Sequence, residues 1–195
     1  MLKQLKPSIL MLLWFTVITG LLYPLLTTGL AQLTMPGKAN GSLIVKDGKV
    51  IGSELIGQNF TAGKYMWGRL SATSPYPYNA VNSVGSNLGP LNPALGDAAK
   101  ARIDALAKAA QEAGVTAGPA VPIDLITASG SGLDAEISVA AAEYQAARIA
   151  KVRGLSEAQV RDVIRSHATG KWLGVFGEAR VNVLQVNLSL DQIKA

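Results

Sequence analysis

The chain has 195 residues, of which 49% are hydrophobic and 16% are charged, so it is richer in apolar residues than an ordinary soluble domain. Its net charge is +5, and without Lys3 and Lys6 near the N-terminus it falls to about +3. No run of Lys or Arg occurs, which argues against a nucleic-acid-binding protein. With no Cys and one His, the composition also argues against a zinc protein.

The N-terminal part of the chain predicts one transmembrane helix. No residue from Pro7 to Gly37 is charged, and about 20 apolar residues suffice to cross a bilayer. Lys3 and Lys6 precede this stretch, which favours a cytoplasmic N-terminus by the positive-inside rule. The predicted division is a cytoplasmic segment 1–8, a transmembrane helix 9–33, a linker 34–41 and one periplasmic domain 42–195.

Removal of this segment as a signal peptide is the alternative interpretation, since Gly29-Leu30-Ala31 fits a small-x-small cleavage site. The length of the apolar stretch favours a retained anchor. Within it, Thr16 and Gly20 form a small-residue face where another helix could approach closely, although lipid could equally cover that face. Pro24 is expected to kink the helix.

The first half of the outer domain begins with a predicted β-hairpin over residues 42–55. Asp47-Gly48 supplies its turn, because both residues tolerate positive φ. Residues 52–92 are rich in Gly, Pro, Asn, Ser and Tyr, and so long an irregular segment is expected to be ordered by contacts or by a partner. Asn92 caps a predicted helix that ends before Gly114.

The second half alternates predicted strands and helices. Its expected elements are a strand at 121–129, a helix at 139–152 capped by Ser138 and stopped by Gly154, a helix at about 157–168 with a Ser156/Gln159 capping box, and a strand at 180–190. On helix 139–152, Gln145 and Arg148 are expected to face solvent. The predicted fold class is mixed α/β, a single N-terminal transmembrane helix followed by one small extracytoplasmic α+β domain.

The stretch SGSGLDAEIS at 129–138 is the candidate for chemistry, because a Ser/Gly-rich loop before a helix can hold phosphate or expose a nucleophile. A P-loop is excluded because Gly170-Lys171 is followed by Trp172. The only histidine, His167, lies on another predicted helix, near its C-terminus. We therefore expect a glycine turn that joins two elements, with Asp134 bonding backbone in the turn, and no catalytic or metal-binding residue.

The irregular segment also carries aromatic residues and an arginine, which are the usual anchors of protein interfaces. These are Tyr65, Trp67, Arg69, Tyr76 and Tyr78. Packing of the segment onto its own domain explains them equally well, and both interpretations stay open here.

An ordered set of segments then resembles one family, the C subunit of the Kdp potassium-transporting ATPase. The segments include YPLLTTGLAQ (23–32), GSELIGQNFT (52–61), GRLSAT (68–73), GSNLGPLNP (85–93), SGSGLDAEIS (129–138) and FGEARVNVLQVNLSLD (176–191). The family usually has Pro where Leu70 and Ala179 stand, and often Pro-His at Ala135-Glu136, and these departures bear on turn rigidity and loop shape at those positions.

The resemblance implies a non-catalytic accessory subunit of a high-affinity, ATP-driven potassium import complex in the bacterial inner membrane. Its expected partners are a channel-like potassium-binding subunit, a P-type ATPase subunit and a small single-span subunit. The expected role is stabilising assembly. The resemblance also implies a role in raising the ATP affinity of the ATPase subunit, although a periplasmic domain would meet little ATP. ATP binding is implied by resemblance alone, and no intrinsic cofactor is expected.

The candidate interface predicted from the residues and the resemblance comprises Thr16, Gly20, Tyr65, Trp67, Arg69, Tyr78, Asn79, Ser131, Gly132 and Asp134. Two other classes of function stay open at this point. One is a membrane-anchored extracytoplasmic binding module that acts outside such a complex. The other is a secreted enzyme released by cleavage after Ala31.

Overall fold

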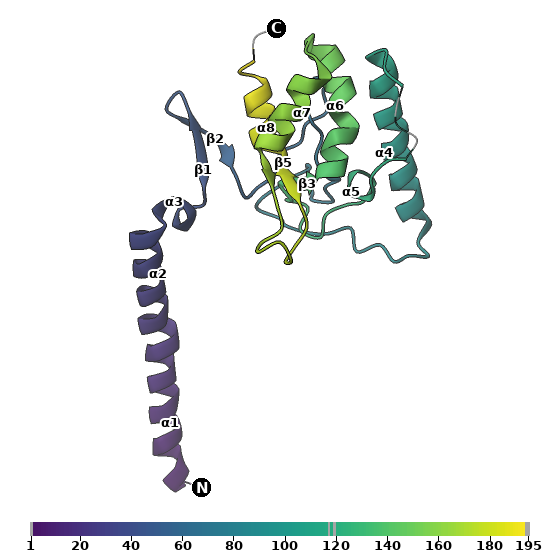
Figure 1. Ribbon diagram of the computed structural model, residues 1–195. Coiled ribbons are helices and arrows are strands. Elements are labelled where there is room, and N and C mark those ends of the chain that lie inside the picture. Colours follow the sequence, from purple (N-terminus) through teal and green to yellow (C-terminus); the bar gives the residue numbers. More distant parts are fainter. Residues whose placement is uncertain (1, 117, 119, 194–195) are drawn as a thin grey trace. The chain divides into compact units, whose positions relative to one another are not determined.

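A computed structural model describes residues 2–116, 118 and 120–193 of the chain (Figure 1). Residue 1 of the predicted N-terminal segment and residues 194–195 of the predicted domain lie outside that range. The chain divides into two compact units, Met1–Ser53 and Glu54–Ala195, and each is described by itself below.

The first unit begins with one long helix formed by α1 (Leu2–Val17), η1 (Ile18–Leu22) and α2 (Tyr23–Thr34). Its stretch Lys3–Thr34 is long and apolar enough to span a membrane, which extends the predicted span 9–33 at its N-terminal end. The η1 segment is a turn of π-helix, in which the Tyr23 N–H donates to Ile18 O. It ends two residues before Pro24, which has no N–H to donate to the preceding turn.

The predicted linker 34–41 contains a helical turn, α3 (Pro36–Ala39), which the sequence did not predict. Pro36 is suited to the first position of a helix, since its φ is fixed and no N–H is needed there. Asn40 closes the turn, and its Nδ2 donates to Pro36 O at 2.8 Å. The chain therefore leaves the long helix through a second, short helical turn.

The predicted hairpin is confirmed as β1 (Leu43–Lys46) and β2 (Lys49–Ser53), which pair antiparallel with Val45 opposite Val50. Asp47 and Gly48 have φ of 51° and 74°, as the tight hairpin turn requires. Leu43, Val45 and Val50 are each more than half exposed, so the hairpin contributes little to any core.

The second unit contains α4 (Pro93–Glu112), α5 (Ile123–Ile126), β3 (Glu136–Ser138), α6 (Val139–Arg153), α7 (Glu157–Ser166), β4 (Ala168–Thr169), β5 (Arg180–Asn182) and α8 (Val183–Leu190). The three strands form an antiparallel sheet in the order β3-β5-β4. Helix α7 packs against both α6 and α8, and the three helices stand above the sheet in Figure 1. The mixed α/β fold class is thereby confirmed.

The helix starts predicted from capping residues are confirmed, whereas α7 ends at Ser166, and Ala168, predicted to lie in that helix, belongs to β4. The Asn92, Ser138 and Ser156 side chains each accept a hydrogen bond from the first turn of α4, α6 and α7, and Ser156 forms the full capping box with Gln159. Gly154 ends α6 with a φ of 68°, the left-handed conformation typical of a glycine after a helix.

The predicted strand 121–129 is wrong. Residues Ile123–Ile126 form one helical turn, α5, and only Ala128 makes a bridge, to Leu70. The reason is Asp124, whose Oδ2 accepts from the Ser138 N–H at 2.7 Å. This bond fixes the turn against the start of α6, and the short apolar run buries Leu125 from a helical turn instead of a strand.

The predicted strand 180–190 is also wrong beyond its first three residues. β5 ends at Asn182, whose side chain accepts from the Gln185 N–H at 3.1 Å and caps α8. Val183, Val186, Asn187 and Leu190 are buried, and their spacing is that of one helix face. The strands β3 and β4, which the sequence did not predict, complete the sheet on either side of β5.

The core lies between the helices and the sheet. It is lined by apolar residues from every helix of this unit, from strands β3 and β5, and from the irregular segment, namely Leu106, Leu125, Ile137, Ala141, Ala146, Ile149, Val160, Ile164, Val181, Val186, Leu190, Met66 and Trp67. Small alanines on α6 permit close packing of its neighbours. The irregular segment thus belongs to the body of the domain.

Candidate functional site

The loop 129–138 is a tight joint, as the sequence predicts. Gly132 has a φ of +70°, and a Cβ there would lie 2.5 Å from Thr73 Cγ2 and 2.7 Å from Val84 O. Its own carbonyl accepts from Ser71 Oγ at 2.7 Å. The position therefore requires glycine for both its conformation and its contacts.

The two polar residues that flank this glycine bond the backbone of the turn. Ser131 Oγ accepts from the Leu133 N–H at 3.1 Å. Asp134 Oδ1 accepts from the Glu136 N–H at 3.0 Å, which confirms its predicted role in the turn. The loop is therefore held by its own side chains, and its Ser131 stays at the surface.

Arg69 connects this loop to the irregular segment. One guanidinium nitrogen lies 3.3 Å from Asp134 Oδ2, and another donates to Ala128 O at 3.1 Å. The Tyr78 hydroxyl donates to Arg69 O at 2.7 Å. Three of the predicted interface residues thus contact one another in space, although up to 65 positions separate them in the sequence.

Tyr78 is packed so closely that its neighbours must be glycines. A Cβ on Gly57 would lie 2.4 Å from its ring, and a Cβ on Gly68 would lie 2.7 Å from its hydroxyl. The pKa of Tyr78 is raised to about 12, mainly by burial. Of the smaller effects, the Arg102 charge lowers this pKa and the Asp134 charge raises it. The phenol therefore stays protonated and continues to donate its hydrogen bond at neutral pH.

Two surface hollows of about 580 Å³ and 510 Å³ meet at this place, and both are lined by Asp134, Glu136 and Arg180. Arg180 Nε lies 2.7 Å from Glu136 Oε2, so the two form an ion pair on neighbouring strands. Arg69 lines the larger hollow and Ser131 the smaller one. The hollows thus combine two charged pairs with apolar lining residues such as Ile123 and Leu133.

Trp67 and Asn79 are buried, and each exposes 6% of its surface to solvent. Asn79 bonds within its own segment, where Nδ2 donates to Ser74 O at 2.8 Å. The Trp67 ring lies between two guanidinium groups, with Arg102 at 4.8 Å and Arg148 at 4.9 Å from its centroid. Both side chains therefore support the surface from below, and a direct contact with a partner stays a prediction.

Tyr65 lies at the other end of this segment, next to the C-terminal part of α6. Its hydroxyl donates to Asp191 Oδ2 at 3.3 Å, and the Arg153 guanidinium lies 5.2 Å from its ring centroid. Tyr65 thus contacts Arg153 and Asp191, whereas Arg69 contacts Tyr78 and Asp134. The interface role of Tyr65 stays a prediction.

Thr16 and Gly20 belong to the first unit and are exposed on its long helix. Gly20 lies inside the π-helical turn, and a Cβ there would meet no atom within 4 Å. The surface at this point is therefore open to a neighbouring helix or to lipid. The interface role of both residues stays a prediction.

His167 and the serines of the loop are not brought together as a catalytic pair. His167 Nε2 lies 2.7 Å from Ser189 Oγ of α8. Ser129 is buried, and its hydroxyl has no hydrogen-bond partner among the residues that the structure describes. A serine nucleophile needs a base within reach, and the observed partner of His167 is a different serine.

Gln145 and Arg148 do not face solvent on α6, so the prediction that they do is wrong. They are 1% and 3% exposed. Gln145 bonds both backbone groups of Trp67, and Arg148 donates to Gly63 O and to Tyr65 O, the latter at 3.1 Å. Burial and, to a lesser extent, the nearby Arg102 guanidinium together lower the pKa of Arg148 to about 10.

A second buried side-chain amide, that of Asn187 on α8, was not predicted from the sequence. Asn187 Oδ1 accepts from the Met66 N–H at 2.8 Å, and its Nδ2 donates to Met66 O at 3.0 Å.

The spacing of residues along α6 does indicate that Gln145 and Arg148 are buried, because residues 141, 145, 148 and 149 follow the period of one helix face. Their polarity hid that signal.

The chain is similar to known proteins along nearly its whole length. The family described as "KdpC: K+-transporting ATPase, c chain" matches residues 5–192. The chain belongs to the KdpC family. A potassium-transporting ATPase KdpC subunit from Polaromonas naphthalenivorans is 57% identical over 190 residues, which cover 97% of this chain and 95% of that protein.

Other KdpC subunits match over similar lengths. Those from Herpetosiphon aurantiacus and Burkholderia mallei are 55% and 54% identical, and each match covers 97% of this chain and 96% of the relative. Because the matches run along nearly the whole chain, they include the N-terminal helix as well as the folded domain. The chain is therefore a component of a potassium-transporting ATPase complex, as the resemblance implied.

Proposed function

We propose that this chain is a non-catalytic accessory subunit that stabilises the assembly of a channel-like potassium-binding subunit with a P-type ATPase subunit. A small single-span subunit is the third expected partner. The observation that carries the proposal is the convergence of Arg69, Tyr78 and Asp134 at the rigid loop 129–138. A preformed surface of this kind binds a partner without first having to be ordered.

The same surface supports assembly better than it supports nucleotide binding. Arg69 and Arg180, the cations that line the larger hollow, lie 3.3 Å and 2.7 Å from the carboxylates of Asp134 and Glu136. A nucleotide phosphate would have to compete with these carboxylates for both guanidinium groups. We therefore propose assembly as the primary role, with any change in the ATP affinity of the ATPase subunit following from it.

The proposed place of action is the bacterial inner membrane, with the N-terminus in the cytoplasm and the folded domain in the periplasm. Lys3 and Lys6 precede the uncharged stretch that begins at Pro7, and they support this orientation. The long helix adds a possible second contact with a partner at Thr16 and Gly20, where small side chains leave room for another helix.

Filling the smaller hollow is the direct test of this proposal. Ser131 lines that hollow at the surface, so Ser131→Trp blocks it without disturbing the core. Purification of the tagged complex in mild detergent from potassium-starved cells is expected to recover both partner subunits with the unchanged chain and much less of them with Ser131→Trp. Ser166→Trp, at an exposed serine of α7, is the matched control.

Ser131→Ala separates a docking role from a chemical one. It removes the hydroxyl but leaves the hollow open, so we expect normal assembly and nearly unchanged potassium-stimulated ATPase activity. Loss of activity in an intact complex would revive a direct chemical role for Ser131. Normal recovery of both partners with Ser131→Trp would mean that the docking surface lies elsewhere.

A further inference from the structure

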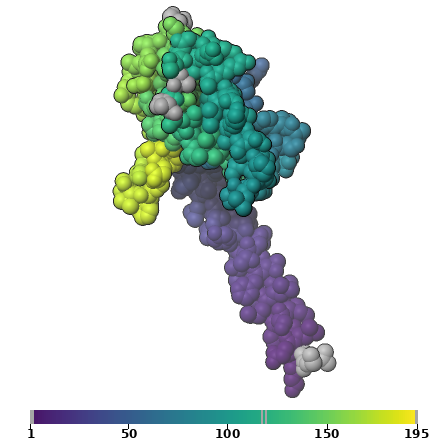
Figure 2. All heavy atoms as spheres, turned by 90° about the vertical axis from the view of Figure 1, so that its right-hand side faces the viewer, coloured from purple at the N-terminus to yellow at the C-terminus, as the bar shows by residue number. Residues whose placement is uncertain are grey.

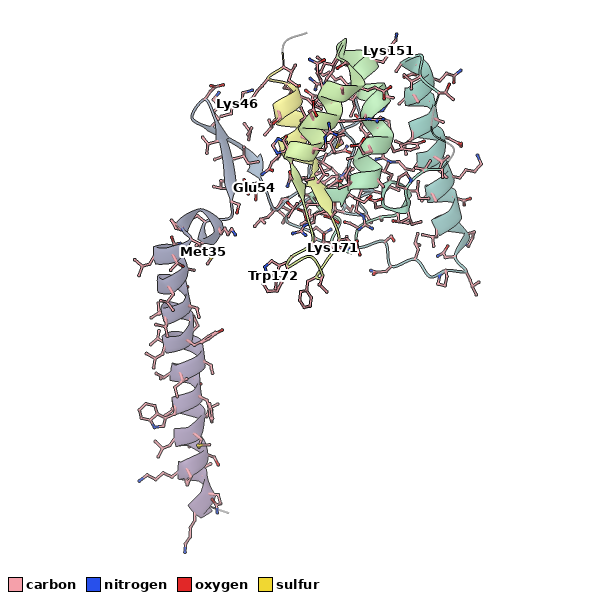
Figure 3. The ribbon with its side chains drawn as sticks, in the orientation of Figure 1. Met35, Lys46, Glu54, Lys151, Lys171 and Trp172 are labelled. Carbon is pink, nitrogen blue, oxygen red and sulfur yellow. The ribbon has the colours of Figure 1, made fainter. Side chains whose placement is uncertain are left out.

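The connection between β4 and β5 exposes four large apolar side chains, Trp172, Leu173, Val175 and Phe176, called the apolar tip below. Each is 60–74% exposed. The segment projects as a yellow lobe from the lower edge of the domain in Figure 2, and Figure 3 shows Trp172 at its end, beyond the sheet. Contiguous apolar surface of this kind on a folded domain marks an interaction site.

The apolar tip is a built structure. The Trp172 N–H donates to Phe176 O at 2.8 Å, and the Phe176 N–H donates to Trp172 O at 2.9 Å. The two rings lie 5.6 Å apart. Leu173 and Gly174 have positive φ, at 52° and 74°. The backbone is thus folded back so that the side chains point outward, and their exposure is a consequence of this geometry.

The composition of the tip fits a lipid interface. Tryptophan and other aromatic side chains favour the headgroup level of a bilayer, and short amphipathic elements enter it by about 5–10 Å. Lys171 is the only charged residue from 168 to 177. Its ammonium lies 3.3 Å from the Glu178 carboxylate, so the base of the tip carries a neutral pair.

The chain itself keeps the domain near lipid. The candidate membrane span ends at Thr34, and the folded unit begins at Glu54. Even a fully extended connection through residues 35–53 reaches no more than about 65 Å. We propose that the apolar tip inserts into the headgroup region of the leaflet on the side where the domain lies, and so gives the chain a second membrane contact.

Tryptophan fluorescence tests this directly, because the chain has three tryptophans, Trp14, Trp67 and Trp172. Trp14 lies in the span and is removed by Trp14→Phe, while Trp67 is buried and serves as an internal reference. The full-length variant is reconstituted into phosphatidylcholine vesicles with brominated acyl chains. We expect it to lose the Trp172 share of its emission, and a second variant that also carries Trp172→Phe to lose none.

Leu173→Asp with Val175→Asp, in the Trp14→Phe background, keeps Trp172 but makes insertion unfavourable. We expect quenching to disappear and the emission of Trp172 to shift to longer wavelength. Val81→Asp with Leu91→Asp is the matched control, because these residues are 94% and 97% exposed outside the tip, and quenching should persist there. Unchanged unfolding transitions of all variants confirm that the domain stays folded.

Two outcomes would overturn the proposal. One is that the folded Trp14→Phe variant, reconstituted into the brominated vesicles, shows no quenching of Trp172 emission. The other is equal quenching in the Leu173→Asp, Val175→Asp variant, which would mean that the tip does not drive the contact. If quenching is absent and the same aspartates abolish recovery of partner subunits, the tip binds an apolar pocket of a partner instead.

Discussion

The Gln145 side chain holds the backbone of Trp67 from both sides. Its Oε1 accepts from the Trp67 N–H at 2.9 Å, and its Nε2 donates to Trp67 O at 3.0 Å. A glutamine on α6 thus pairs with an irregular segment much as a neighbouring strand would. Both backbone groups are buried, and buried peptide groups without a partner are costly.

Gln145→Leu is therefore expected to destabilise the domain strongly. It leaves the two backbone groups of Trp67 unpaired at about 1–3 kcal/mol each, and it also removes the partner of an Arg148 N–H. Chemical denaturation monitored by Trp fluorescence measures the loss in the free energy of unfolding. Gln111→Leu, at an exposed position of α4, should change that free energy by less than about 0.5 kcal/mol. Equal effects of the two substitutions would contradict the role assigned to Gln145.

Gly132→Val is expected to prevent stable folding. Valine at a φ of +70° is strained, and its Cβ would meet Thr73 and Val84, so we expect a loss of more than about 3 kcal/mol. Ser131→Ala next to it removes one exposed hydrogen bond and should cost less than about 1 kcal/mol. Yield of folded protein and thermal unfolding compare the two. A well-folded Gly132→Val protein would show that the joint is more tolerant than its contacts indicate.

Tyr78 gives the stability a specific pH dependence. Its pKa is raised to about 12 in the folded chain, from about 10 in the unfolded chain. The folded state therefore holds the phenolic proton more tightly, and this contribution is fully present below pH 10 and is lost as the pH rises towards 12. Its size is on the order of 2–3 kcal/mol.

The matching experiment compares the free energy of unfolding of the unchanged chain and Tyr78→Phe between pH 8 and pH 12. The difference between the two should shrink in the upper part of that range, because phenylalanine does not ionise. In the unchanged chain, the tyrosinate absorbance of Tyr78 should also appear at a higher pH than that of an ordinary phenol. A constant difference over the whole range would mean that the Tyr78 phenol is not held as the structure indicates.

The proposed orientation can be measured by labelling single introduced cysteines, because the chain contains no cysteine of its own that would react. Lys151→Cys, at an exposed position of the folded domain (Figure 3), is expected to react with a membrane-impermeant maleimide in intact spheroplasts. Lys3→Cys should react only after the membrane is opened. The reverse pattern would place the domain in the cytoplasm and would restore access to ATP.

Local signals predicted where α4, α6 and α7 begin. Asn92, Ser138 and Ser156 cap their helices through hydrogen bonds that span two or three residues, so short stretches of sequence contain the whole cause. The run after Asn182 was misassigned because alternation of apolar and polar residues there also matches one face of a helix. Tertiary packing, with Val186 and Leu190 in the core, decided for the helix.

The candidate site was predictable only in part. Gly132 and Asp134 act within their own turn, and their roles followed from the residue types. The contact of Arg69 with Asp134 depends on how distant segments are brought together, which no local pattern encodes. Gln145 and Arg148 were misplaced because polar side chains are usually exposed on helices, and here their partners are the backbone groups of another segment.

The pairing of Asn187 with Met66 has a consequence for how the protein is made. The two residues are 121 positions apart, so the segment around Met66 leaves the ribosome long before the amide that holds it. In the proposed orientation, the segment around Met66 crosses the membrane before the residue of α8 that pairs with it. A chain that ends before α8 is therefore expected to leave the Met66 N–H and C=O without these partners.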